Sequence, residues 1–323
     1  MAERKNMCAK DRFRDKNFIM LPTVDVCFKG LMNNPKVRKG FIAALLKEDP
    51  KEIRETFLLP TVLRQDYPDD KLGVLDVRVL MEDGRQLDME MQVAYFEYWD
   101  ARILFYLSKI FTDQLKKGEP YENLKKCVHV SILDFIHFED DEECYRQITF
   151  CDRKTGKEYT DLMEIQILEL QKLSQDQKDG NGLINWMRFL GGKNRREFEE
   201  MAKTDEYIGE AYRELEKLSA DEKAKLEYEA REKAIRDYNS QMSSALRRGM
   251  QRGMEKGIEK GMEKGIEQGM KQGMQQGIEQ GRQDMIVHML QSGAAPEEII
   301  RLTGAEPEEV KKAAEAAGVK ASS

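Results

Sequence analysis

The sequence predicts an α/β domain that ends near residue 190, followed by a long helical segment and a small helical C-terminal region. Three observations support this. Two stretches of alternating apolar residues, 72–81 and 85–93, flank the turn sequence Glu-Asp-Gly and predict a β-hairpin. After residue 192 the chain is highly charged and helix-prone. From 249 to 281 a glycine stands at every fourth position.

The other elements of the α/β domain follow from local patterns. Residues 35–48 place apolar side chains on one helical face after Pro35, which predicts a helix. Residues 57–64 fit a strand or an extended edge, because Pro60 cannot donate to a sheet. Downstream we expect an amphipathic helix over 99–116 and strands over 127–136 and 145–151, whereas 159–168 fits either a strand or a helix.

We expect four parts along the chain: an α/β domain over 1–192, a charged helical segment over 193–248, the glycine-repeat helix over 249–283, and a region of short helices over 284–323. A glycine inside a helix costs ~1 kcal/mol relative to alanine, so a lone repeat helix is disfavoured. Close packing across the glycine stripe, in a right-handed homodimer, would offset part of this cost. The alternative is a flexible linker without a partner.

Composition narrows the function classes. The 323-residue chain is 40% hydrophobic and 35% charged, with a net charge of −7. Residues 1–130 carry 23 Lys and Arg against 21 Asp and Glu, so a nucleic-acid site is expected in the N-terminal half of the chain.

No apolar run reaches the ~18 residues that a membrane helix needs, and no signal peptide is recognisable, so we expect a cytoplasmic protein without a membrane partner. Five cysteines without a CxxC pair predict free thiols, and His129 and His137 are expected to be structural.

The predicted hairpin carries the candidate chemistry. Because strand side chains alternate between faces, Asp88, Glu90 and Gln92 share one face, and pairing through the turn lets Asp76 point the same way as Glu90. Converging carboxylates are costly unless a positive charge lies between them, and Mg²⁺ favours one or two carboxylates plus water. The alternative is a hairpin with one solvent-exposed polar face and no function.

The segment from Asp76 to Gln92 resembles motifs II and III of the PD-(D/E)XK nuclease superfamily, and more narrowly the Rpn family of recombination-promoting nucleases, also described as PD-(D/E)XK nuclease family transposases. Further pieces resemble that family in the same order, over roughly residues 17–240. They are Asp25, Phe28 and Lys29, then Arg102 and Tyr106, then Gln114, Gly118 and Tyr121, the strand-like run 128–135, the segment 167–170, and Trp186 with Phe189.

This resemblance implies a restriction-endonuclease-like core and a Mg²⁺-dependent DNA endonuclease linked to recombination or mobile elements, with Mn²⁺ as a possible substitute. Asp76, Glu90 and the carbonyl of Met91 would hold the ion. The superfamily lysine is replaced by Gln92, which can position water but supplies no charge. We expect Lys29 to supply that charge.

Other arrangements remain open at this stage. Arg102 or Lys109 are alternatives to Lys29 as the source of positive charge, and Asp88 is expected at the rim of the site. A second interpretation is a catalytically weak or inactive nuclease fold that serves as a DNA- or protein-interaction module. A third, an RNase H-like transposase, needs a third acid that the sequence does not offer.

Overall fold

The computed structural model describes residues 17–65, 67, 69, 71–174 and 182–318. The chain divides into two compact units, Met1–Ser240 and Gln241–Ser323. No helix in these described stretches is both long and apolar enough to span a membrane. The predicted cytoplasmic location and the four-part division of the chain stay predictions.

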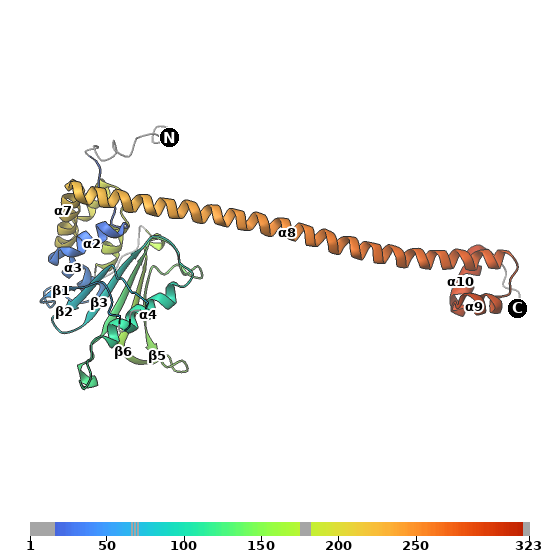
Figure 1. The fold of residues 1–323 in the computed structure, drawn as a ribbon, viewed down its shortest axis with the longest axis horizontal. Helices are drawn as coiled ribbons and strands as arrows, with labels where there is room; N and C mark the ends of the chain where they lie inside the picture. Colours follow the sequence, from blue (N-terminus) through green and yellow to red (C-terminus); the bar gives the residue numbers. More distant parts are fainter. Residues whose placement is uncertain (1–16, 66, 68, 70, 175–181, 319–323) are drawn as a thin grey trace. The chain divides into compact units, whose positions relative to one another are not determined.

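A six-stranded mixed sheet forms the centre of the first unit, in the order β1-β2-β3-β4-β6-β5 (Figure 1). Strand β2 is antiparallel to both β1 and β3. Strands β3, β4 and β6 are parallel, and β5 is antiparallel to β6. Their bounds are Thr56–Leu59, Val77–Met81, Gln86–Gln92, Cys127–Leu133, Tyr145–Cys151 and Glu158–Glu169, for β1 to β6 in turn. The ambiguous segment 159–168 is therefore a strand.

The predicted hairpin is present as β2 and β3, with Val77 paired to Met89. Gly84 closes its turn with φ of 90°, a value that favours glycine. The first strand is shorter than expected, because β2 begins at Val77 and Asp76 lies in the bend before it. The strand register, extended by one residue, still places Asp76 opposite Glu90.

Helices cover both faces of the sheet. On one face, helices α2 (Asp25–Asn33), α3 (Pro35–Leu46), α5 (Leu183–Gly191) and α7 (Glu206–Ala220) share a core with strand residues of one phase, including Met89 and Met91. On the other face lies α4 (Trp99–Thr112), which packs near Leu133 and Ile167. The central strand β3 is thereby enclosed, and Asp88 and Glu90 are 0% and 3% exposed. The alternative of a hairpin with one solvent-exposed polar face is therefore wrong, because the carboxylate side chains of β3 are buried.

The charged segment after residue 192 is helical, as predicted. It comprises α6 (Arg195–Met201), α7 and the start of α8 (Glu222–Gln291). Gly40 on α3 permits a close approach to α7, because a Cβ there would collide with Tyr207. The first turns of α8 are fixed by Tyr228, which is fully buried and whose hydroxyl accepts a hydrogen bond from the Leu21 amide at 3.2 Å.

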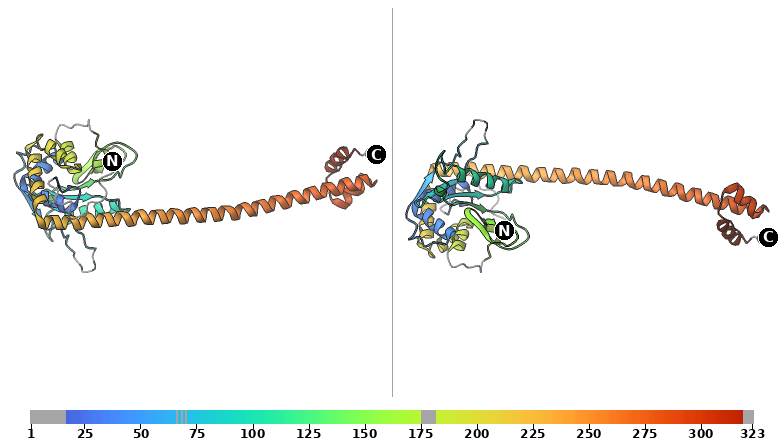
Figure 2. Two further views of the ribbon diagram at one scale, coloured as in Figure 1. Left: turned by 90° about the horizontal axis from the view of Figure 1, so that it is seen from above. Right: turned by 90° about the horizontal axis from the view of Figure 1, so that it is seen from below.

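The second unit consists of the remainder of α8 with two short helices, α9 (Pro296–Thr303) and α10 (Pro307–Ala317). The region of short helices expected over 284–323 begins instead with the last part of α8, which ends at Gln291. Both short helices lie beside that part (Figure 2), around a small core of Ile286, Leu290, Ile299, Ala305, Val310 and Ala314. A Cβ added at any of the repeat glycines would meet no described atom within 4 Å apart from the local helix backbone.

Four cysteines lie in the described part of the chain and all are free thiols. Cys27, Cys127 and Cys144 are buried, and Cys151 is exposed. The fifth, Cys8, lies outside the described residues.

Candidate active site

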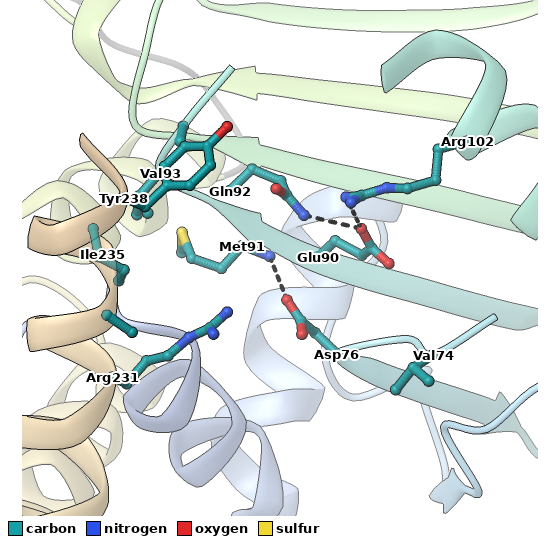
Figure 3. Close-up of a pocket in the computed structure, with 12 residues that line it drawn as sticks. Val74, Asp76, Glu90, Met91, Gln92, Val93, Arg102, Arg231, Ile235 and Tyr238 are labelled. Atoms are coloured by element: carbon teal, nitrogen blue, oxygen red, sulfur yellow. Dashed lines mark hydrogen bonds and ion pairs between the residues drawn. The ribbon is translucent and has the colours of Figure 1, made fainter. Parts of the chain in front are cut away.

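A cavity of about 490 Å³ opens in the first unit where the carboxyl end of β3 meets the first turns of α8 (Figure 3). It brings together Asp76, Glu90, Met91 and Gln92, four of the five residues expected at the site. The fifth, Lys29, contacts the site through Asp76. The remaining lining residues are Val74, Val93, Ala94, Arg102, Arg231, Ala234, Ile235 and Tyr238.

Asp76 is held by two donors. Lys29 on α2 places its Nζ 2.9 Å from Oδ1 of Asp76. The backbone amide of Met91 donates to Oδ2 at 3.1 Å. In a strand, the amide and carbonyl of one residue point to the same side, so the Met91 carbonyl is directed toward the side on which Asp76 lies.

Glu90 lies deeper, where it accepts hydrogen bonds from Arg102 Nη2 at 2.8 Å and from Gln92 Nε2 at 3.2 Å. Burial raises the pKa of Glu90 to about 7, and the nearby charge of Asp88 acts in the same direction. His129 and Arg102 oppose this rise without cancelling it. The side chain therefore titrates near neutral pH when no other cation is bound.

Asp88 is not at the rim of the site, contrary to expectation. It is fully buried, and its Oδ2 lies 2.7 Å from Nδ1 of His129 on β4, whose Nε2 lies 2.8 Å from Oγ of Ser131. Burial raises the pKa of Asp88, while His129 opposes the rise. The register explains the pairing, since Asp88 stands opposite His129 in the parallel ladder. The structural role expected of His129 agrees with this buried hydrogen-bonded position.

Positive charge enters the site from three elements. Lys29 on α2 reaches Asp76, and Arg102 on α4 reaches Glu90. Arg231 on α8 was not anticipated, and its Nε lies 2.8 Å from Oδ1 of Asp25. The other carboxylate oxygen of Asp25, Oδ2, lies 3.9 Å from Nζ of Lys29. Lys109, the other alternative source of positive charge, is not among the described residues that line the cavity.

Sequence reasoning missed the whole contribution of α8. Arg231, Ile235 and Tyr238 are spaced four and three residues apart, which puts them on one face of a helix. That spacing was visible in the sequence. Nothing in it indicated that the helix would return to the carboxyl end of β3, because that depends on the packing of Tyr228.

The donor set suits a small divalent cation. Two carboxylates and a backbone carbonyl are hard oxygen ligands, and Mg²⁺ is usually held by one or two carboxylates together with water and substrate oxygens. Within the described residues, no cluster of three or more His, Cys, Asp or Glu side chains forms an all-protein cage. The arrangement therefore fits an ion that completes its coordination with water and phosphate.

The sequence model of the PD-(D/E)XK nuclease family transposases matches residues 22–245, more than half of the chain. The chain belongs to this family. Its mixed six-stranded sheet fits a PD-(D/E)XK core. The family match favours this core over the RNase H-like alternative. The family match includes the α8 residues that line the cavity and ends before Gly249, where the repeat begins. Comparison with curated proteins and with solved structures found no match.

Proposed function

We propose that this PD-(D/E)XK nuclease family transposase is a metal-dependent DNA endonuclease that hydrolyses phosphodiester bonds. The observation that carries the proposal is that Asp76 and Glu90 line one cavity, with Asp76 hydrogen-bonded to the amide of Met91, the residue after Glu90. The family suggests nuclease activity, and the cavity offers oxygen ligands beside cationic side chains. The enzyme would act in DNA recombination or in the movement of mobile elements.

Asp76, Glu90 and the Met91 carbonyl are the residues that would hold Mg²⁺, or Mn²⁺ in its place. When bound, the ion supplies a Lewis acid that lowers the pKa of a coordinated water and neutralises charge on the phosphate. Lys29 and Arg102 keep the two carboxylates oriented in its absence.

Gln92 takes the position of the superfamily lysine. Its Nε2 donates to Glu90, which fixes the carboxamide next to the site. A carboxamide oxygen can accept a hydrogen bond from an attacking water, but the group carries no charge. Lys29, whose side chain is 39% exposed, would provide the cationic contact to the scissile phosphate.

The test is digestion of a supercoiled plasmid by the purified full-length protein in Mg²⁺, Mn²⁺, Ca²⁺ or EDTA. We expect nicked and linear products in Mg²⁺ and in Mn²⁺, and intact plasmid in EDTA. Cleavage that persists in EDTA would refute the metal-dependent mechanism.

A second candidate, an interaction module on an inactive nuclease fold, is favoured by one observation. Each of the two carboxylates already faces a cation, Lys29 on Asp76 and Arg102 on Glu90, so a metal ion has to compete with both. DNA binding without cleavage under every metal condition would favour this alternative over the endonuclease.

We also propose that α8 forms a homodimer through its glycine repeat. Four residues rise ~6 Å and overshoot a helical turn by ~40°, so the glycine stripe completes a turn in roughly 54 Å. Glycines allow two helix axes to lie about 7 Å apart, closer than the ~8–10 Å of ordinary helix pairs. At that separation, two helices that follow the glycine stripe would cross at roughly 40°. Right-handed GxxxG pairs in membranes cross at about 40°. The Met and Ile residues that follow the glycines are exposed in a single chain, and a partner would cover them.

A further inference from the structure

Exposed aromatic side chains stand directly beside the cavity. Strand β3 ends at Gln92, the next two residues line the cavity, and Tyr95, Phe96 and Tyr98 follow with 55%, 43% and 64% of their surface exposed. We call residues 95–98 the aromatic loop. A single exposed ring is common on protein surfaces, but a cluster of exposed rings marks a candidate binding surface, and this cluster lies beside the candidate active site.

The aromatic loop is continuous with the site. The ring centroids of Phe96 and Tyr98 are 6.0 Å apart. The guanidinium of Arg102 lies 5.9 Å from the centroid of Phe96, and the same side chain donates to Glu90 at 2.8 Å. A DNA strand that contacts Phe96 is therefore connected to Glu90, a candidate metal ligand, through one intervening side chain, that of Arg102.

A further aromatic ring and a cation approach from another direction. Tyr238 and Arg231 extend from one face of α8 toward β3, whereas Arg102 reaches the site from the far side of the strand (Figure 3). The Tyr238 side chain remains 43% exposed. The cavity is thus bordered by aromatic and guanidinium groups on two sides, the combination with which proteins bind single-stranded nucleic acid.

The charge of the site favours stacking over simple attraction to a duplex backbone. The three cations at the cavity are already paired with carboxylates, Lys29 with Asp76, Arg102 with Glu90 and Arg231 with Asp25. Without a bound metal ion, these ion pairs leave little net positive charge at the cavity to attract a duplex backbone, and the whole chain carries a net charge of −7. Base stacking needs no net charge, and only unpaired bases offer a free face to a side chain.

From these contacts we infer that the site acts on DNA with unpaired bases, whose bases stack on the aromatic loop and on Tyr238 while the backbone crosses the cavity. This inference rests on the proposed nuclease function, and it specifies the substrate as single-stranded DNA or a single-stranded segment within a duplex.

The experiment measures fluorescence anisotropy of full-length protein in EDTA with three labelled DNAs: a single strand, the matching blunt duplex, and that duplex with an internal loop of unpaired bases. We expect the single strand and the looped duplex to bind at least about fivefold more tightly than the blunt duplex. Tyr98→Ala and Tyr238→Ala should each weaken single-strand binding at least about fivefold, the lower end of a lost base stack. Tyr98→Phe and Tyr238→Phe retain the ring and should bind like the wild type.

The matched control is Tyr159→Ala, which removes an 86% exposed tyrosine at the start of β6. It lies eight residues before Ile167, the β6 residue in register with Ser131 and so with Glu90, a separation of ~26 Å along the strand. Its single-strand binding should match the wild type.

Equal affinity for all three DNAs, no measurable binding to any, or unchanged single-strand binding in both alanine variants would overturn the inference. Its failure is separable from that of the nuclease. Plasmid cleavage without a preference for unpaired bases would refute the inference alone. Ring-dependent single-strand binding without any cleavage in Mg²⁺ would refute the nuclease alone.

Discussion

Lys29 and Asp76, residues from different layers of the fold, form an ion pair with 2.9 Å between Nζ and Oδ1. Lys29 belongs to α2 on one side of the sheet, and Asp76 to the bend that leads into β2. The pair puts a primary amine next to a carboxylate that lines the cavity, on a chain whose superfamily lysine position holds Gln92. The amine is therefore available at the site without being part of the hairpin.

Replacing Lys29 should reduce cleavage. Lys29→Ala removes the cation proposed to contact the phosphate, and loss of one such electrostatic contact lowers a rate by about 10²-fold. Lys29→Arg keeps the charge and should retain more activity. The matched control is Lys36→Ala, because Lys36 has a similar side-chain exposure, 42% against 39%, and pairs with the exposed Glu206. Single-turnover rates at saturating Mg²⁺ decide the question, and a Lys29→Ala rate equal to that of Lys36→Ala would exclude the role.

Gln92→Ala should impair turnover more than DNA binding. The carboxamide donates to Glu90 and is proposed to position water, so its loss affects a step after the substrate is bound. We expect kcat to fall at least about tenfold while the Kd for DNA stays within about twofold. The comparison needs both a cleavage rate and an equilibrium binding curve. If kcat is unchanged, Gln92 has no part in the mechanism.

The raised pKa of Glu90 predicts a pH dependence of stability in metal-free protein. The folded-state pKa of Glu90 is about 7, against an ordinary glutamate pKa of 4.5, so between these pH values the native state binds more protons than the unfolded state. This group therefore lowers the free energy of unfolding as pH rises from about 5 to 8, by an amount on the order of 2 kcal/mol. Urea unfolding in EDTA should show this decline in the wild type and a smaller one in Glu90→Gln. Equal slopes for the two proteins would contradict the assignment.

Alanine at the repeat glycines distinguishes a packed α8 from a solitary helix. In a packed pair, Gly261→Ala with Gly265→Ala would separate the backbones and shift full-length protein toward monomer. In a solitary helix the same change adds ~1 kcal/mol of helix stability per site, and the oligomeric state does not change. Sedimentation equilibrium and circular dichroism separate these outcomes. The control, Gln268→Ala with Gln272→Ala, improves helix propensity outside the glycine stripe and should leave a dimer intact. A wild-type protein that is monomeric at high concentration would refute the homodimer.

Local patterns predicted most of the strands, because the alternation of apolar side chains directly reflects the two faces of a sheet. The hairpin with Asp76 and Glu90 followed from its turn sequence and its phase alone. The burial of Asp88 did not follow from these patterns. In an isolated hairpin its polar face would meet water, and only the pairing of β3 with β4, which brings His129 opposite Asp88, encloses it.

The contribution of α8 depends on contacts across more than a hundred residues of sequence. Arg231 reaches Asp25, 206 positions earlier, because the Tyr228 hydroxyl fixes the helix against Leu21. No local spacing encodes that contact. The alternation of apolar residues over 72–81 also does not indicate that β2 begins only at Val77, with Asp76 in the bend before it.

The most direct test compares single-turnover plasmid cleavage in Mg²⁺ by the wild type, Asp76→Ala, Glu90→Ala and the control Asp161→Ala. Asp161 has a 59% exposed side chain that pairs loosely with Lys126, so its loss should have little effect on folding. If Asp76 and Glu90 hold the metal, each alanine variant loses cleavage while keeping the wild-type circular dichroism spectrum, and Asp161→Ala cleaves normally. Cleavage by a folded Asp76→Ala or Glu90→Ala protein at the wild-type rate would contradict the site.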